Sequence, residues 1–240
     1  MVEILEGKGV ATKLEMRGTD AMLRRAKQIY QTQGLLKLLQ QGLTWLSAQF
    51  FEYHAYYLYC LSLEDDPSIT DANPIPPLED ISPRIVSTIS EAEQLEADGF
   101  EFYSITANAR EKLESGAIAT CVFVGKELAN LGWVAMTQEA KDSLKSPPFE
   151  IDFSSGECWS SHVWTKPKYR RTGLLVYADM KRRQFQLQQG VRVSKWAINK
   201  RNIPPQRLAT RLSFQICGQG RYVRILCWKS WKEEPLTHHE

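Results

Sequence analysis

Cysteine is scarce in this sequence, and no CxxC pair occurs. The five residues are Cys60, Cys121, Cys158, Cys217 and Cys227. An odd and widely spread set of this kind supports neither a disulfide framework nor a zinc site, and it suits a reducing compartment. We therefore expect free thiols, no bound metal and a cytoplasmic location.

Long apolar runs are also missing. The most apolar stretch, residues 35–63, is interrupted by lysine, glutamine, glutamate and histidine side chains. A membrane-spanning helix needs about 20 consecutive, predominantly apolar residues, which this stretch does not supply. The first residues carry acidic side chains and no long apolar core, so they lack the pattern of a secretory signal. The sequence predicts a soluble protein without a membrane span.

Acidic residues are few in the C-terminal part of the chain. Residues 151–240 hold 17 Lys and Arg against 6 Asp and Glu, whereas residues 1–150 hold 13 against 22. A basic segment of this kind favours an anionic ligand or partner, and a solvated basic face is the alternative. Nucleic acid is the less favoured partner, because the basic residues do not cluster with aromatic ones in any recognised RNA-binding motif.

Prolines divide the chain into two parts. Five of them lie between residues 64 and 83 and disfavour regular structure there. Before them, apolar residues at spacings of three and four predict a helix within residues 20–52, and an aromatic run predicts a strand over 56–63. We interpret residues 1–66 as an N-terminal appendage of helix and strand, 67–83 as a proline-rich linker and 84–240 as the main domain.

Strands and helices alternate in the main domain. The patterns predict strands over 84–89, 117–124, 131–137, 157–165 and 191–198, and helices over 108–115, 174–189 and 204–212. Ser90 and Glu93 have the spacing of a capping box at the start of a further helix. A last hairpin is predicted between 215–216 and 222–228, across the glycines at 218–220. The predicted fold class is mixed α/β, with a mostly antiparallel sheet flanked by helices.

The segment from Thr165 to Leu175 carries the most chemical information. A strand ends there, a proline turns the chain, and a basic loop leads into a helix that begins near Gly173. Unpaired backbone N–H groups and a partial positive charge make a helix N-terminus a favourable anion site. Glycine allows a phosphate to approach the backbone closely. Four cations add to the positive charge of the loop: Lys166, Lys168, Arg170 and Arg171.

At this segment the chain resembles the GNAT superfamily of acyl-CoA N-acyltransferases. The family signature Q/R-x-x-G-x-G/A is matched by Arg170-Arg171-Thr172-Gly173-Leu174-Leu175, after a strand that ends in Thr165-Lys166-Pro167. The order that follows is also similar, with a helix, a glycine, a strand, Asn202, a second helix and Leu212-Ser213-Phe214. The resemblance covers about residues 84–240 and implies a GNAT-like sheet.

The resemblance implies acetyl-CoA as the acyl donor. Arg170 and the backbone N–H groups of Arg171, Thr172, Gly173, Leu174 and Leu175 would hold the pyrophosphate. The pantetheine would pair with the backbone of Val163 and Thr165, and Asn202 would lie near it. The sequence departs from the family at Leu175, where a second glycine or alanine is usual, and at Ala209, where many members carry a tyrosine that acts as general acid.

Three side chains are candidates for catalysis. Glu157 and His162 precede the loop and could act as the general base, although simple alternation places them on opposite faces of the strand. Tyr222 could donate a proton to the departing thiolate. Each has a structural alternative: a surface charge for Glu157, a half-buried core residue for His162 and packing for Tyr222.

We predict an N-acetyltransferase that acts by direct attack of an amine, with a small molecule or a peptide as acceptor. Two alternatives stay open, a CoA-binding module without turnover and a transferase of a larger acyl or aminoacyl group. The N-terminal appendage would serve as an acceptor lid or as the contact of a homodimer.

Overall fold

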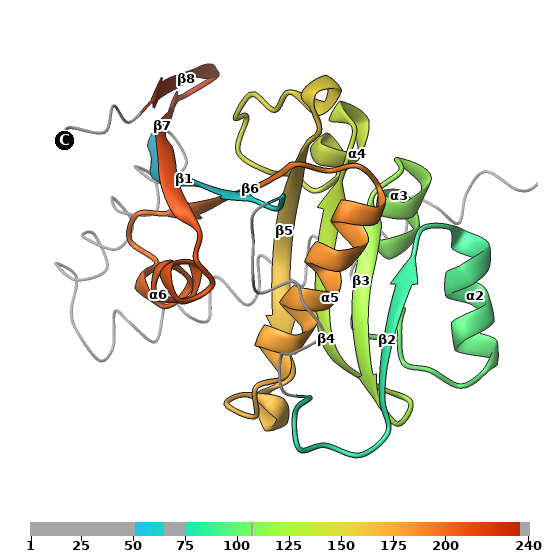
Figure 1. The fold of residues 1–240 in the computed structure, drawn as a ribbon. Helices are drawn as coiled ribbons and strands as arrows, with labels where there is room; N and C mark the ends of the chain where they lie inside the picture. Colours follow the sequence, from blue (N-terminus) through green and yellow to red (C-terminus); the bar gives the residue numbers. More distant parts are fainter. Residues whose placement is uncertain (1–50, 65–74, 107, 236–240) are drawn as a thin grey trace, which may run out of the picture. The chain divides into compact units, whose positions relative to one another are not determined.

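The computed structural model describes residues 51–64, 75–106 and 108–235. The helix expected within residues 20–52 lies outside the described residues up to residue 50, and so do residues 67–74 of the proline-rich linker. One eight-stranded sheet runs in the order β2-β3-β4-β5-β6-β1-β7-β8 (Figure 1). The strands are β1 (Phe51–Ser62), β2 (Ile81–Val86), β3 (Ile118–Val124), β4 (Glu127–Ala135), β5 (Glu157–Thr165), β6 (Val193–Asn199), β7 (Gln215–Ile225) and β8 (Trp228–Pro235). The helices are α2 (Ile89–Ala97), α3 (Ala109–Glu114), α4 (Gln138–Ser143), α5 (Leu174–Gln188) and α6 (Ile203–Arg211).

The chain divides into two compact units. The described part of the smaller unit consists of residues 51–53 and Val223–Ser230, where Arg224 Nε donates to Glu52 Oε2 at 2.8 Å. The larger unit contains the rest of the described residues and all of the candidate site residues. Its sheet pairs antiparallel from β2 to β5 and parallel between β5 and β6. The predicted fold class, a mixed α/β sheet that is mostly antiparallel, is therefore confirmed.

Helices cover the two faces of the sheet, and neighbouring residues of β3 show this directly. Phe123 packs in a core with residues of α2, α3 and α4, whereas Val122 packs in another with residues of α5. Successive side chains of a strand point to opposite faces, so α5 lies on one face and α2 to α4 lie on the other.

The strand predicted over 56–63 is present as β1, and it pairs antiparallel with β6 from Tyr56 opposite Asn199 to Ser62 opposite Val193. Part of the segment that the sequence assigns to the appendage is thus a strand of the sheet. The expectation of free thiols is wrong for two cysteines. Cys60 of β1 and Cys217 of β7 form a disulfide with a Cα–Cα distance of 5.9 Å. Their separation of 157 residues hides this neighbourhood from any local pattern.

The last hairpin is also predicted wrongly. One strand, β7, runs through the glycines at 218–220, and the turn falls between β7 and β8 instead. Gly220 has a packing role, because a Cβ at this position would lie 2.3 Å from the Trp231 ring and 2.8 Å from Phe149. Gly220 thus makes room for its neighbours, and neither glycine turns the chain.

The helix α2 begins two residues before the predicted position. Thr88 is its N-cap, and Glu91 completes the capping box that the sequence assigned to Ser90 and Glu93. The Thr88 side chain accepts a hydrogen bond from the Glu91 amide, while Glu91 accepts from the backbone of Thr88 and Ser87. Both pairs have the right spacing, so spacing alone did not distinguish them. The short helix α4, capped by Thr137, was not predicted.

Candidate functional site

The strands β5 and β6 part from each other after three residue pairs. They are parallel, and the last pair places Trp159 opposite Lys195. The remaining six residues of β5, from Ser160 to Thr165, have no paired residue in the ladder with β6, although the Ser160 hydroxyl lies 3.1 Å from that of Ser194. Figure 1 shows β6 turning away from β5 beyond this point. The backbone of β5 therefore has an open edge toward its carboxyl end, next to a wedge-shaped gap in the ladder.

A β-bulge bends β5 within this open stretch. Its pairing with β4 shifts between Leu131 opposite Trp164 and Trp133 opposite Ser161, so that His162 and Val163 both lie across from Gly132. His162 has a φ of 52°, in the left-handed region that a non-glycine residue rarely adopts. A bulge leaves backbone groups unpaired and redirects the neighbouring side chains, and such bulges are frequent next to functional sites.

A cleft lies along the open edge, between β5, β6, α5 and α6. Its side chains leave a cavity of only about 10 Å³ between them. Its apolar lining consists of Val163, Leu175, Trp196, Leu208, Leu212 and Phe214. Its polar lining consists of Ser160, Asp179, Arg182, Arg183, Gln186 and Ser194. The cleft thus has apolar walls. Its polar groups come from α5 and from Ser160 and Ser194, which lie near the place where β5 and β6 part.

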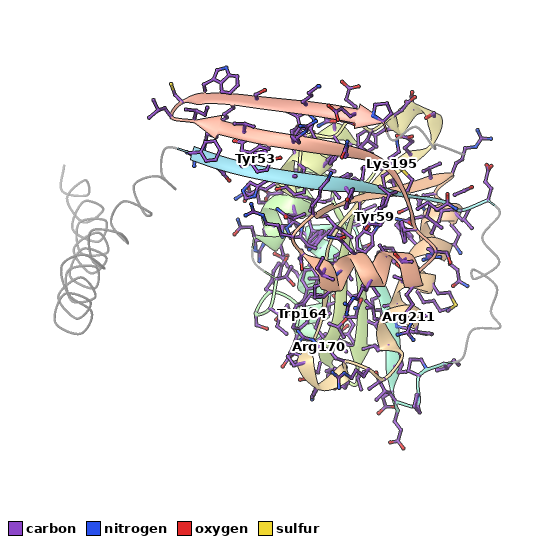
Figure 2. All side chains as sticks on the ribbon, turned by 90° about the vertical axis from the view of Figure 1, so that its left-hand side faces the viewer. Tyr53, Tyr59, Trp164, Arg170, Lys195 and Arg211 are labelled. Carbon is purple, nitrogen blue, oxygen red and sulfur yellow. A yellow bond between two sulfur atoms is a disulfide. The ribbon has the colours of Figure 1, made fainter. Side chains whose placement is uncertain are left out.

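The loop after β5 presents the N-terminus of α5. A short 3₁₀ turn at Pro167–Tyr169 leads to Gly173, which is the N-cap of the helix. Arg171 and Gly173 have φ values of 67° and 87°, and a Cβ built on Gly173 would meet no atom within 4 Å. The backbone is therefore exposed here, next to helix N–H groups that have no partner within the helix. This is the geometry of an anion site. Figure 2 labels Trp164 and Arg170, which stand on either side of the turn.

Two of the four cationic side chains predicted for the loop bind a carboxylate of β4. Lys166 and Lys168 both form salt bridges with Glu127 of β4, and the Tyr169 hydroxyl donates to the same carboxylate at 2.6 Å. Hydrogen bonds from the two lysines, and then from Tyr169, lower the pKa of Glu127 to about 2.

The two arginines of the loop are placed differently. Arg170 and Arg171 are exposed and form no salt bridge within the described residues. Arg170 Nε donates to the Thr165 carbonyl at 3.2 Å, which anchors it to the end of β5. The two arginines, more than the lysines, supply the positive charge beside the helix N-terminus.

The other predicted ligand-binding residues fall around the same edge. Val163 and Thr165 lie on the stretch of β5 without a partner on β6, and Leu175 lines the cleft. Thr172 donates from its hydroxyl to the Tyr169 carbonyl at 2.8 Å, which closes the loop, and Leu174 is fully buried. The structure thus brings these residues together around the N-terminus of α5.

Asn202 is the exposed N-cap of α6, directly after β6. Because β5 and β6 are parallel, α5 and α6 both begin at the carboxyl ends of their strands, which is where ligands bind in open α/β sheets. Ala209 is a residue of α6 and is fully buried in the core. The methyl side chain of Ala209 has no proton to donate.

Glu157 lies at the other end of β5, where the strands are still paired. Lys195 Nζ contacts its Oε1 at 2.5 Å, and the Asp152 amide donates to its Oε2 at 2.8 Å. Both carboxylate oxygens therefore have partners within the fold. This arrangement favours the structural alternative for Glu157.

His162 lies at the bulge and is exposed. Its Nδ1 is 2.7 Å from the Ser161 hydroxyl. Partial burial, and then repulsion from Lys112, lower the pKa of His162 below its ordinary value, so the ring is neutral at pH 7 and can accept a proton. Tyr222, the candidate proton donor, lies on β7 and stacks on His54 with ring centroids 6.4 Å apart.

A buried polar cluster on α5 was missed. Asp179, Arg182, Arg183 and Gln186 are all less than a tenth exposed. Their spacings of three, four and seven place them on one face of the helix, and this polar periodicity could have indicated them. The apolar residues of the same helix give the stronger periodic pattern and indicate its other face.

The order of strand, glycine loop, helix, diverging parallel strand and second helix is the order that the resemblance implies. In this order of elements the fold resembles that of the GNAT superfamily. No family model and no curated protein matches the chain. Among solved structures, it is similar to a GCN5-related N-acetyltransferase from Sphaerobacter thermophilus, with 18% identity, a TM-score of 0.43, and coverage of 81% of this chain and 56% of that one. The chain therefore spans little more than half the length of that protein.

Two further structures have a similar likeness to this chain. A GCN5-related N-acetyltransferase from Kribbella flavida has 13% identity and a TM-score of 0.44, and the match covers 82% of this chain and 65% of that one. A tandem GNAT protein from the clavulanic acid biosynthesis pathway has 14% identity and a TM-score of 0.46, with coverage of 83% and 60%.

Two searches for other kinds of site were negative within the described ranges. No helix there is long and apolar enough to cross a membrane. No group of three or more His, Cys, Asp or Glu side chains there could hold a metal ion.

Proposed function

We propose that this protein is an acyl-CoA-dependent N-acyltransferase that moves an acetyl group from acetyl-CoA to an amine. One observation carries the proposal. The edge of β5 that is open toward β6 leads directly to an exposed helix N-terminus at Gly173, so that a site for an extended chain and a site for phosphates are continuous.

The residues present fit such a donor. The open space over Gly173 and the N–H groups of the first turn of α5 suit the pyrophosphate, and Arg170 and Arg171 lie beside it. The unpaired backbone around Val163 and Thr165 suits the amide groups of a pantetheine, which can pair like an added strand. Leu175 stands where the family usually has glycine or alanine, and its larger side chain leaves less room for the pyrophosphate at the first turn of α5.

The bulge is where the chemistry would take place. When bound, acetyl-CoA supplies a thioester carbonyl carbon. The amine nitrogen forms a bond to this carbon, the carbon–sulfur bond breaks, and the sulfur leaves as a thiolate with the bonding electron pair. His162 accepts the proton that the amine loses, because its ring is exposed, neutral and located at the bulge. The thiolate takes a proton from water or from Tyr222.

A second candidate function is a CoA-binding module without turnover. The observation that favours it is Ala209, which is buried where many GNAT members have a proton-donating tyrosine. Measured turnover separates the two, since both functions predict binding of acetyl-CoA and only the transferase releases free CoA in the presence of an amine.

Calorimetric titration with acetyl-CoA tests the shared binding site. Gly173→Asp places a carboxylate where the pyrophosphate would lie, and we expect it to abolish micromolar binding. Gly190→Asp is the matched control, because Gly190 lies just past the other end of α5 with a φ of 79° and also has open space around its Cβ position. Absence of binding by the folded wild-type protein would overturn the proposal, and so would equal loss of binding in both variants.

Turnover is then measured with a panel of small-molecule and peptide amines, with release of the CoA thiol as the readout. The acyltransferase predicts thiol release that depends on the amine. Tight binding without release for any amine would leave the CoA-binding module as the function.

A further inference from the structure

Exposed apolar side chains gather on the smaller of the two units. Among the described residues, this unit consists of residues 51–53 and Val223–Ser230 alone. It nevertheless supplies more than half of the exposed large hydrophobic side chains that the structure describes. These are Phe51, Tyr53, Ile225, Leu226 and Trp228, each between 42% and 59% exposed. Exposed hydrophobic residues normally occur singly, and a group of them marks an interaction site.

Strand alternation places three of these side chains on one face. The start of β1 lies beside the turn between β7 and β8 (Figure 2). Arg224 Nε of β7 donates to Glu52 Oε2 of β1 at 2.8 Å, so these two side chains share a face of the ribbon. Successive side chains of a strand point to opposite faces. Phe51, Tyr53 and Ile225 therefore lie together on the other face.

Trp228 belongs to the same face as Ile225. β7 ends at Ile225 and β8 begins at Trp228, so the two residues flank a two-residue turn and lie opposite each other. Opposite side chains of an antiparallel pair lie on one face, with Cβ atoms about 4.5–5.5 Å apart. Leu226 lies in the turn itself. The five side chains thus form one surface, which we name the ribbon patch.

The chain that precedes the ribbon carries an apolar stripe in its sequence. Between residues 35 and 50, apolar residues recur at spacings of three and four: Leu35, Leu38, Leu39, Leu43, Leu46 and Phe50. This spacing lines apolar side chains along one face of a helix. Most of the stability of such a helix in a protein comes from the packing of that face. The stripe therefore requires a surface to pack on.

The stripe is joined directly to the ribbon patch. It ends at Phe50, and the next residue, Phe51, is a member of the patch. A surface on the same chain has an effective concentration on the order of millimolar when the link is short. Any second molecule has to compete with this concentration. The patch and the stripe are thus favoured as partners of each other.

The two surfaces also match in size. A helix is about 10 Å across with its side chains. Three neighbouring strands, spaced about 4.8 Å apart, make a ribbon of about the same width. A helix of residues 35–50 would be about 24 Å long, which is enough to cross the ribbon. Contact between them would remove the apolar surfaces of both from water.

We propose that residues 35–50 pack as an amphipathic helix on the ribbon patch of their own chain. The stripe faces the patch, and the polar residues between its members face solvent. The N-terminal segment then completes the packing of the ribbon. The contact lies outside the candidate site, so it does not depend on the proposed function.

Cys227 supplies a native probe of the patch. It is exposed in the turn, between Leu226 and Trp228. Residues 1–50 contain no cysteine. The other four cysteines do not compete, because they are buried or form the disulfide: Cys121, Cys158, Cys60 and Cys217.

A cysteine placed on the stripe should be joined to Cys227 by bismaleimidoethane, a short linker between two thiols. Cysteine is introduced singly into the full-length protein at three stripe positions, and the residue after each is its matched control: Leu39, Leu43 and Leu46, against Gln40, Thr44 and Ser47. Each control is turned by about 100° on a helix and is one residue nearer to Phe51. We expect a monomeric product that forms at least about tenfold faster from the best stripe position than from its control, since a fixed orientation raises the effective concentration of one thiol.

The alkylation rate of Cys227 gives a second measurement that needs no linker. If the stripe covers the patch, Leu43→Asp places a charge in the contact and should raise this rate several-fold. Thr44→Asp, on the other side of the helix, should leave it unchanged. Near-ultraviolet circular dichroism establishes that each variant is folded, and the cross-linking result decides if Leu43→Asp is not.

Three results would overturn the proposal. Equal reaction of every stripe cysteine and its control would show that the stripe does not face the patch. A cross-linked dimer in place of the monomer would make a second copy of the chain the occupant. Slower alkylation of Cys227 on addition of phosphatidylcholine and phosphatidylglycerol vesicles, without any effect of Leu43→Asp in their absence, would make a lipid surface the occupant.

Discussion

The guanidinium of Arg182 occupies the space that a side chain at position 132 would fill. Alanine in a strand is ordinarily preferred over glycine, which has a higher conformational entropy to lose. Here a methyl group would push Arg182 away from Thr120 and Asp179, to which it donates two buried hydrogen bonds. We expect Gly132→Ala to lower the free energy of unfolding by about 1–3 kcal/mol, the range of overpacking in cores.

Urea unfolding measures this effect, and a double-mutant cycle tests its cause. In the background of Arg182→Met, whose side chain is flexible and uncharged, the same alanine should cost much less. If Gly132→Ala is as stable as the wild type, the guanidinium is not confined in the way described here.

Two glycines of β7 predict opposite outcomes for the same substitution. A Cβ at Gly220 would lie 2.3 Å from the Trp231 ring, whereas a Cβ at Gly218 would make ordinary contacts of 3.5 Å with Leu58. Gly220→Ala is therefore expected to destabilise the protein by about 1–3 kcal/mol, and Gly218→Ala to change its stability little. Thermal unfolding of the two variants side by side gives the comparison. Equal stability would show that the Trp231 ring does not confine position 220 in this way.

This pair illustrates which parts of the fold were predictable from sequence. The bounds of β5 were predicted as the structure has them, and α5 within one residue, because alternation, helical spacing and a closing glycine are local signals. Gly218 and Gly220 have the composition of a turn, and only the partners across the sheet show that they pack in a strand. The local sequence around Gly218 and Gly220 suits a turn as well as a strand, so contacts with residues distant in the sequence determine which of the two forms.

The candidate site was predictable to a similar degree. The glycine loop and the helix N-terminus followed from one continuous segment, Arg170 to Leu175. The role of Glu127, which draws two lysines away from that loop, depends on the pairing of β4 with β5. The divergence of β5 from β6 after Trp159 has no sequence signal of its own, because it is a loss of pairing between strands whose paired residues are 36 positions apart.

The disulfide between Cys60 and Cys217 gives a chemical prediction. Alkylation of the denatured, unreduced protein should label Cys121, Cys158 and Cys227, and labelling after reduction should reach all five cysteines. Because the bond closes a long loop in the unfolded chain, Cys217→Ala is expected to cost about 2–5 kcal/mol of stability. Labelling of all five thiols without a reductant would show that the bond is not formed.

The pH dependence of turnover distinguishes the two candidate bases. The pKa of His162 is lowered by partial burial and by Lys112. The ring therefore becomes neutral, and able to accept a proton, at a pH below its ordinary pKa of about 6.5. We expect kcat/KM to rise with pH through a midpoint below that value and to be level near pH 7. His162→Gln should reduce kcat/KM by about 10²- to 10⁴-fold and remove the acidic limb of the profile.

Glu157→Gln is the comparison for that experiment. Its carboxylate is already held by Lys195 and the Asp152 amide, so the substitution should affect stability more than the shape of the pH profile. Loss of the acidic limb in Glu157→Gln, with the limb retained in His162→Gln, would exchange the two assignments.

Hydrogen exchange in the presence and absence of acetyl-CoA tests the central claim most directly, that an acyl-CoA occupies the open edge of β5 and the N-terminus of α5. We predict slower exchange on addition of acetyl-CoA in peptides that cover residues 160–165 and 170–176, with no change in β2 and β3. Binding accompanied by protection elsewhere in the chain, with these two segments unchanged, would contradict the claim.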